Sequence, residues 1–198
     1  MGITLVKGQR ISLSKPGEPG LSKVFCGLGW DVAPVNAGGI GGLFGKKKEG
    51  QAIDLDASAL LFDANKQLVD VVWFRQLQSK DGSIKHSGDN RTGAGDGDDE
   101  VIHVELNRVP ENVQTLVFTV NSFTGQNFNT VANSYCRLVD STSNVELARF
   151  DLGARGEHTA LILAKLYRHN GDWKMHAIGE TASGKTVGDL LPAIAGSL

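Results

Sequence analysis

Acidic side chains are concentrated in one short stretch of the chain, Gly88-Asp89-Asn90-Arg91-Thr92-Gly93-Ala94-Gly95-Asp96-Gly97-Asp98-Asp99-Glu100. Five carboxylates against one arginine leave this stretch a local charge of −4, whereas the whole chain carries −2. Carboxylates so close in sequence repel one another unless a cation lies between them. The glycines allow tight turns that point backbone carbonyls inward. Oxygen ligands on an adaptable loop are what calcium prefers. The pattern therefore favours a calcium site, and the alternative is a solvated acidic loop.

A second pair of carboxylates lies in the segment 53–62, which has the alternation of a β-strand. Its odd-numbered apolar residues share one face, and Asp54 and Asp56 project from the other. Two carboxylates on one strand face are unfavourable without a counter-charge. Leu60 and Phe62 continue the acidic face and indicate that it is half covered. We therefore predict that Asp54 and Asp56 form a second arm of the metal site.

A phosphate-binding pattern, G-x-x-x-x-G-K-T, is matched by residues 179–186. In a true phosphate-binding loop, backbone amides hold the phosphates, lysine meets their charge and the hydroxyl binds magnesium. That fold needs a parallel sheet and a second acidic segment, and only twelve residues follow Thr186. The segment is therefore predicted to be a turn into a terminal helix, with nucleotide hydrolysis as the alternative.

Other metal and catalytic motifs are excluded by spacing. The acidic loop has Asp89 and Glu100 at positions one and twelve of an EF-hand loop, but Ala94 stands at the sixth position, where glycine is required. The five histidines are scattered without paired spacing, so a zinc site is not predicted: His86, His103, His158, His169 and His176. No serine lies in a G-x-S-x-G elbow.

The elements that must position these residues are short strands. Segments rich in β-branched and aromatic residues recur with turn residues between them, and no long helical period intervenes, which favours an all-β sandwich or barrel. Asn170-Gly171 is the strongest hairpin signal. One short C-terminal helix is predicted over 186–195, although Pro192 cuts into it. The predicted strands cover 3–14 (two short strands), 24–30, 53–62, 68–77, 101–109, 113–120, 135–139, 145–152, 159–167 and 173–178.

Length and composition predict one domain, residues 1–198, with 40% hydrophobic and 21% charged residues. A pI near 6.2 gives no basic field for nucleic acid. No apolar run is long enough for a transmembrane segment, and the first residues lack a signal-peptide core. Cys26 and Cys136 lie in apolar stretches, where buried free thiols are expected. We expect a reduced, cytoplasmic protein.

The Gly-rich run at about 37–50, ending in three lysines, is predicted to be a flexible loop, with contact to a membrane or partner as the alternative.

Three stretches of the sequence resemble the TerD family of tellurite-resistance and general stress proteins. They are Gly-Leu-Gly-Trp-Asp at 27–31, Asp-Leu-Asp-Ala-Ser at 54–58 and the acidic block at 88–100. The resemblance extends over nearly the whole chain. It implies a two-sheet antiparallel β-sandwich that binds Ca²⁺ through acidic loops at one end, without an established catalytic activity. It also implies other Ter-type stress proteins as partners, at the inner face of a membrane. The residues that match the family's metal-binding segments are Asp54, Asp56, Asp89, Asn90, Asp96, Asp98, Asp99 and Glu100, to which Asp31 is added, although Asp31 could instead cap the turn after Trp30.

Two classes of function remain open from the sequence. The first is a non-enzymatic, calcium-binding module of the stress response. The second is an enzyme, either a nucleotide hydrolase that uses Lys185 or a metal-dependent hydrolase that uses the acidic loop. A receptor for tellurium oxyanions fits less well, because an acidic site repels anions unless calcium bridges them.

Overall fold

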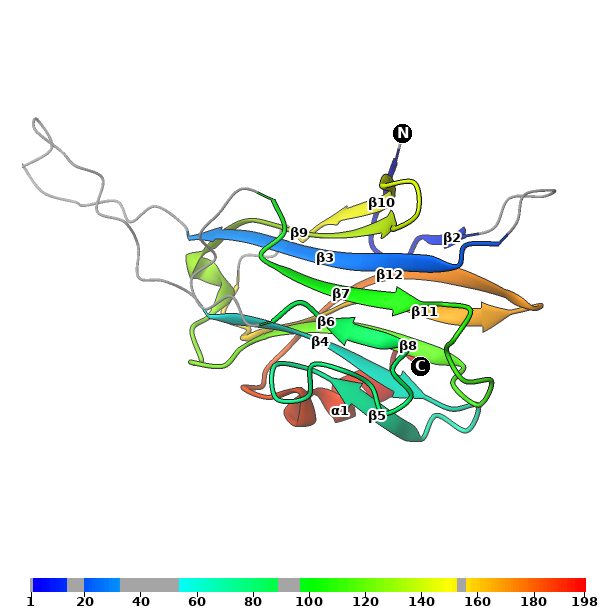
Figure 1. The fold of residues 1–198 in the computed structure, drawn as a ribbon. Coiled ribbons are helices and arrows are strands. Elements are labelled where there is room, and N and C mark those ends of the chain that lie inside the picture. Colours follow the sequence, from blue (N-terminus) through cyan, green and yellow to red (C-terminus); the bar gives the residue numbers. More distant parts are fainter. Residues whose placement is uncertain (1, 14–19, 33–53, 89–96, 153–155) are drawn as a thin grey trace, which may run out of the picture.

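The computed structural model describes residues 2–13, 20–32, 54–88, 97–152 and 156–198. Within them the chain forms two β-sheets that pack face to face, as Figure 1 shows. Neighbouring strands pair antiparallel, except for one parallel pair at an edge. The predicted antiparallel sandwich is confirmed. The predicted Gly-rich loop at 37–50 lies outside the described residues.

The two sheets each contain six strands in the described residues. Sheet A has the order β1 (Ile3–Thr4), β10 (Val145–Asp151), β9 (Val131–Asp140), β3 (Lys23–Val32), β7 (Glu100–Glu105) and β6 (Ile84–His86). Sheet B has the order β2 (Arg10–Ser12), β12 (Asp172–Ala182), β11 (Ala160–His169), β8 (Thr115–Ser122), β4 (Leu55–Phe62) and β5 (Leu68–Val72). The parallel pair is β1 with β10.

Strand β4 is buried along its whole length, and its two faces pack against different cores. Leu55, Ala57, Ala59 and Leu61 belong to the main core between the sheets. Leu60 and Phe62 belong to a second core on the outer face of sheet B. The alternation predicted for this strand is confirmed, and its acidic face is covered more fully than the sequence indicated.

A short helical segment covers that second core. It consists of the 3-10 helix η3 (Val187–Leu190) and the α-helix α1 (Leu191–Ala195), and it contributes Val187, Leu190 and Ile194 (Figure 1). Pro192 lies in the first turn of α1, where its missing N–H costs nothing, so the predicted C-terminal helix forms around it. A further 3-10 turn, η2 (Phe128–Thr130), precedes β9.

Several local predictions can be compared with the structure. Asn170 and Gly171 have φ angles of 53° and 84° in the turn between β11 and β12, as the hairpin signal predicts. The strand predicted over 68–77 ends at Val72, because Trp73 and Gln76 exchange backbone hydrogen bonds in a tight turn. Cys26 and Cys136 are buried free thiols with 3.4 Å between their sulfur atoms. No helix in the described part of the chain has the length and apolarity needed to cross a membrane.

Candidate metal centre

Carboxylates from three segments lie at one end of the sandwich. Asp31 is in the last residues of β3, Asp54 directly precedes β4, and Asp98 and Asp99 lead into β7. In Figure 1 the end of β3 and the start of β4 both lie at the left end of the two sheets. The predicted ligands Asp89, Asn90 and Asp96 lie outside the described residues.

Glu100 connects the acidic segment to β4 of the opposite sheet. Its side chain is fully buried, and Oε2 accepts a hydrogen bond of 2.6 Å from the backbone N–H of Ala57. Strand β5 pairs only with residues 59–62 of β4, so Ala57 lies beyond the reach of that neighbour. The Glu100 carboxylate thus satisfies a backbone donor at a strand edge that none of the described strands covers there.

His86 completes this edge and was not identified as a site residue from the sequence. Its Nε2 lies 3.2 Å from the carbonyl oxygen of Ala57 and 3.3 Å from Oε2 of Glu100. Nδ1 accepts a hydrogen bond of 3.0 Å from the N–H of Gly88, which assigns the ring hydrogen to Nε2. Together Glu100 and His86 bind both backbone groups of Ala57, as a neighbouring strand would. Nothing in the sequence indicated this role for His86, because its partner Ala57 lies 29 residues away in the chain.

Asp99 connects the acidic segment to β3. Its Oδ2 accepts a hydrogen bond of 2.8 Å from the N–H of Trp30, and its own N–H donates to the carbonyl of Leu28 at 2.8 Å. The pairing of β3 with β9 shifts register between Gly29 and Asp31, which is an irregularity centred on Trp30. The acidic segment is therefore fixed to the residue that precedes Asp31.

The electrostatics of Asp99 favour a nearby cation. Burial raises the pKa of Asp99, and the charges of Asp31, Asp98 and Glu100 raise it further, whereas the hydrogen bond from Trp30 lowers it. A raised pKa means that ionising this carboxylate is unfavourable in the folded chain. A divalent cation between these groups would remove that cost.

Asp98 has a different environment from the other predicted ligands. Arg137 and Tyr135 donate hydrogen bonds to its two carboxylate oxygens, at 2.8–3.1 Å. The carboxylate is 6% exposed and lies directly over Gly27. Its charge is thus already compensated by a guanidinium in this structure.

The remaining candidates differ in exposure. Asp56 is 3% exposed on the outer face of sheet B, in register with Asn121, and it directly precedes Ala57. Asp54 is half-buried. Asp31 is exposed, and its Oδ2 accepts a hydrogen bond of 2.8 Å from Asn133.

The possible ligand atoms at this end of the sandwich are of the type that a hard cation such as calcium prefers. The carboxylates at this end are oxygen donors, which is the ligand type of calcium rather than of zinc. Within the described residues, no group of three or more His, Cys, Asp or Glu side chains is arranged so that it could hold a metal ion. The described residues alone therefore do not form a metal site, and the predicted ligands Asp89, Asn90 and Asp96 lie outside them.

The phosphate-loop pattern has a structure of its own. Gly179 to Ala182 continue β12, which pairs antiparallel with both of its neighbours. Asp189 Oδ2 accepts hydrogen bonds from the N–H of Lys185 at 3.0 Å and from the N–H of Thr186 at 2.9 Å. The amides that would bind a phosphate are thus occupied by a carboxylate, as expected for a turn into the terminal helix.

Fold and site together define a class, a two-sheet β-sandwich with carboxylates from three segments at one end. The chain belongs to the TerD family, whose domain model matches residues 1–192. It is 50% identical over 189 residues to tellurium resistance protein TerZ of Serratia marcescens, covering 95% of this chain and 94% of the relative. It is 42% identical to General stress protein 16U of Bacillus subtilis (strain 168), covering 93% of each.

A solved structure has the same fold. It is that of a homologue of telluride resistance protein (TerD) from Streptomyces coelicolor A3(2), with a TM-score of 0.67, 24% identity and coverage of 85% of this chain and 94% of the other. The family resemblance predicted from the sequence is confirmed. The chain is a member of a family of tellurium-resistance and stress-response proteins.

Proposed function

We propose that this chain is a calcium-binding module of the tellurium-resistance and stress response, and that it acts by binding rather than by catalysis. The cation would lie between the acidic segment, the start of β4 and the end of β3. Asp54, Asp56, Asp31 and Asp99 would supply ligands, together with Asp89, Asn90 and Asp96. When bound, calcium would neutralise carboxylates that otherwise repel one another.

One observation carries the proposal: the acidic segment is hydrogen-bonded both to the end of β3, which carries Asp31, and to the start of β4, which carries Asp56. Asp99 accepts from Trp30, the residue before Asp31, and Glu100 accepts from Ala57, the residue after Asp56. Residues from three parts of the chain are thereby held next to one another. Such convergence of carboxylates is costly without a cation, which supports a metal-binding role over a solvated loop.

An enzymatic role is less well supported. A metal-dependent hydrolase needs an open coordination position with a nucleophile nearby, and the geometry offers no argument for one. Nucleotide hydrolysis through Lys185 is disfavoured, because Asp189 occupies the amides that a phosphate would need. The family names of the relatives support a role in stress resistance, and we place the protein in the cytoplasm with other Ter-type proteins at the inner face of a membrane as partners.

Calorimetric titration of the chelator-treated chain with calcium chloride tests the proposal. The wild type is expected to bind calcium, and Asp56→Asn is expected to lose most of that binding. Asp172→Asn is the matched control, because it removes an exposed carboxylate at the turn that joins β11 and β12. Absence of calcium binding by the wild type, or equal losses in both variants, would contradict the proposed site.

A further inference from the structure

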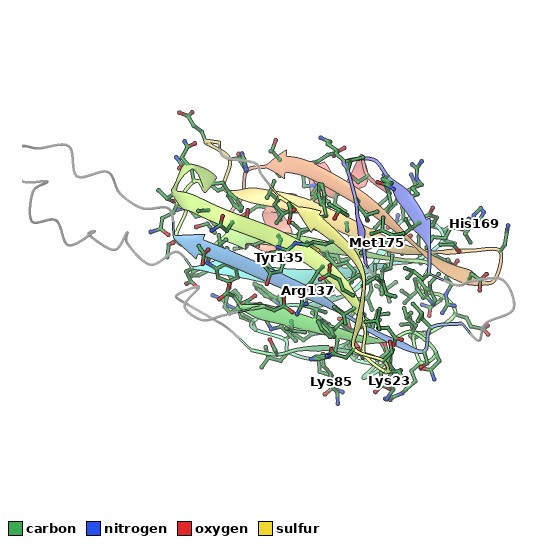
Figure 2. All side chains as sticks on the ribbon, turned by 90° about the horizontal axis from the view of Figure 1, so that it is seen from above. Lys23, Lys85, Tyr135, Arg137, His169 and Met175 are labelled. Atoms are coloured by element: carbon green, nitrogen blue, oxygen red, sulfur yellow. The ribbon has the colours of Figure 1, made fainter. Side chains whose placement is uncertain are left out.

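Arg137 holds Asp98 with a bidentate ion pair on the outer face of sheet A. Its Nε lies 2.8 Å from Oδ1 of Asp98, and its Nη2 lies 2.9 Å from Oδ2. The hydroxyl of Tyr135 donates to Oδ1 at 3.1 Å. Parallel hydrogen bonds between a guanidinium and a carboxylate fix both the position and the orientation of the acid. Figure 2 shows Tyr135 and Arg137 together on β9.

Two glycines on the neighbouring strand make room for this arrangement. Gly27 is in register with Arg137 and Gly29 with Tyr135, across the pairing of β3 with β9. A Cβ atom at Gly27 would lie 2.2 Å from Oδ2 of Asp98, and one at Gly29 would lie 2.5 Å from the Tyr135 ring. The Asp98 carboxylate and the Tyr135 ring therefore occupy the space that side chains at Gly27 and Gly29 would fill.

Contacts on the other side hold Arg137 and Tyr135 in place. Arg137 Nη1 lies 3.5 Å from Glu146 of β10. Arg149, also on β10, lies over the Tyr135 ring at 3.8 Å from its centroid. Hydrogen bonding to Asp98 raises the pKa of Arg137, and burial followed by the Asp98 charge raises that of Tyr135 to about 12, so both groups stay protonated donors. The site that binds Asp98 is thus built from three strands, β3, β9 and β10, besides the acidic segment itself.

We propose that Arg137 is a positioning residue for the calcium site. Arg137 binds Asp98, which then does not bind the metal ion, and thereby fixes the adjacent Asp99 and Glu100 in their positions. This inference rests on the proposed function. It assigns to Asp98 a role different from that of its acidic neighbours: Asp98 anchors the segment on sheet A, while Asp99 faces β3 and Glu100 faces β4. Partners that orient metal-binding groups typically change metal affinity 10- to 100-fold when they are removed.

The direction in which Arg137→Gln changes calcium affinity separates the positioning role from the alternative, in which Asp98 is itself a calcium ligand. If Asp98 were a calcium ligand, Arg137 would compete with the metal, and Arg137→Gln would tighten calcium binding. Removing a positive charge near the site would act in the same direction through long-range electrostatics. If Arg137 positions the segment, Arg137→Gln weakens calcium binding despite this electrostatic effect.

The test is the calcium dissociation constant of Arg137→Gln, Asp98→Asn and the double variant, measured by calorimetry. We expect Arg137→Gln to raise the dissociation constant about tenfold, and the double variant to be no weaker than the weaker single variant. Arg108→Gln is the control, because it removes an exposed ion pair with Glu105 away from the acidic end and should leave the affinity unchanged. Tyr135→Phe removes a single hydrogen bond and serves if Arg137→Gln does not fold, with a smaller loss of affinity expected.

The outcomes separate the two proposals. A wild type that binds no calcium contradicts the proposed function and this inference with it. A wild type that binds calcium, with Arg137→Gln binding equally or more tightly, contradicts only the positioning role. Additive losses in Arg137→Gln and Asp98→Asn also contradict it, because one ion pair cannot be lost twice.

Discussion

The carboxylate of Glu100 and the backbone amide of Ala57 meet across the two sheets, with 2.6 Å between Oε2 and the nitrogen. Glu100 belongs to sheet A and Ala57 to sheet B. The contact therefore ties the end of the acidic segment to the strand that carries Asp56 and that Asp54 directly precedes. Any ion held between the two arms would depend on this tie.

The first prediction is that Glu100→Ala destabilises the chain by about 3 kcal/mol even in chelator, because it leaves the buried N–H of Ala57 without its acceptor. Glu100→Gln keeps an acceptor and should cost only about 1 kcal/mol. Urea unfolding measures both. Glu105→Ala, on the same strand, removes a half-buried carboxylate that pairs with Arg108 and Lys23 at the surface, and it should lower the unfolding free energy much less. A Glu100→Ala variant as stable as the Glu105 control would show that the tie contributes little.

A second prediction is that Asp56 and Asp99 act on one ion. Calcium at about a hundredfold over its dissociation constant should stabilise the wild type by about 2.7 kcal/mol, from mass action alone. Asp56→Asn and Asp99→Asn should each remove most of that gain, so their effects couple by roughly 0.5–3 kcal/mol in a double-mutant cycle. Thermal unfolding with calcium and with chelator measures the cycle. Independent, additive effects would mean that the two arms do not share a cation.

The third prediction concerns pH. Burial and neighbouring carboxylates raise the pKa of Asp99 in the folded chain, so the folded state binds this proton more tightly than the unfolded state does. Stability linked to this group is therefore present at low pH and lost as the pH rises through the folded pKa. In chelator, the wild type should gain stability relative to Asp99→Asn as the pH falls from about 7 to about 4. Calcium should weaken this trend because it competes with the proton. A shift in the opposite direction would rule out a raised pKa at Asp99.

The fourth prediction is that the Gly179–Thr186 segment does not bind nucleotide phosphates. Purified wild type should show no ATP or GTP turnover, and Lys185→Ala should leave calcium affinity unchanged, because only the backbone of Lys185 is used in the contact with Asp189. A steady-state phosphate-release assay, with a chelator control, measures the turnover. Turnover that disappears in Lys185→Ala would restore the hydrolase hypothesis.

Local pattern was enough to predict most of the strands. The alternation in β4 gave both of its faces correctly, because each face has its own core. Strand β6 was missed because three residues carry too little pattern to be recognised. The end of β5 was misplaced because a turn interrupts the apolar run: Trp73 and Gln76 exchange backbone hydrogen bonds, and Asp70, 7% exposed, accepts hydrogen bonds from Gln76 and Lys80.

The acidic residues were found from their spacing, but their separate environments were not. Asp98 and Asp99 are adjacent and chemically identical in sequence. Only the fold shows that Arg137, 39 positions later, lies beside the first, and that the Trp30 amide, 69 positions earlier, lies beside the second. Spacing predicts which residues can bind a cation, whereas their distribution among partners depends on strand pairing.

The covering of sheet B by η3 and α1 has a consequence for synthesis on the ribosome. All twelve strands of the described chain precede residues 187–195, so the segment that covers the apolar outer face of sheet B is translated after every strand of that sheet. Domains begin to fold from the N-terminal side during translation, and exposed apolar surface at that stage promotes aggregation. If sheet B folds before this segment docks, Leu60, Phe62 and Ile162 are open to solvent at that stage, where chaperones that recognise apolar surface would bind.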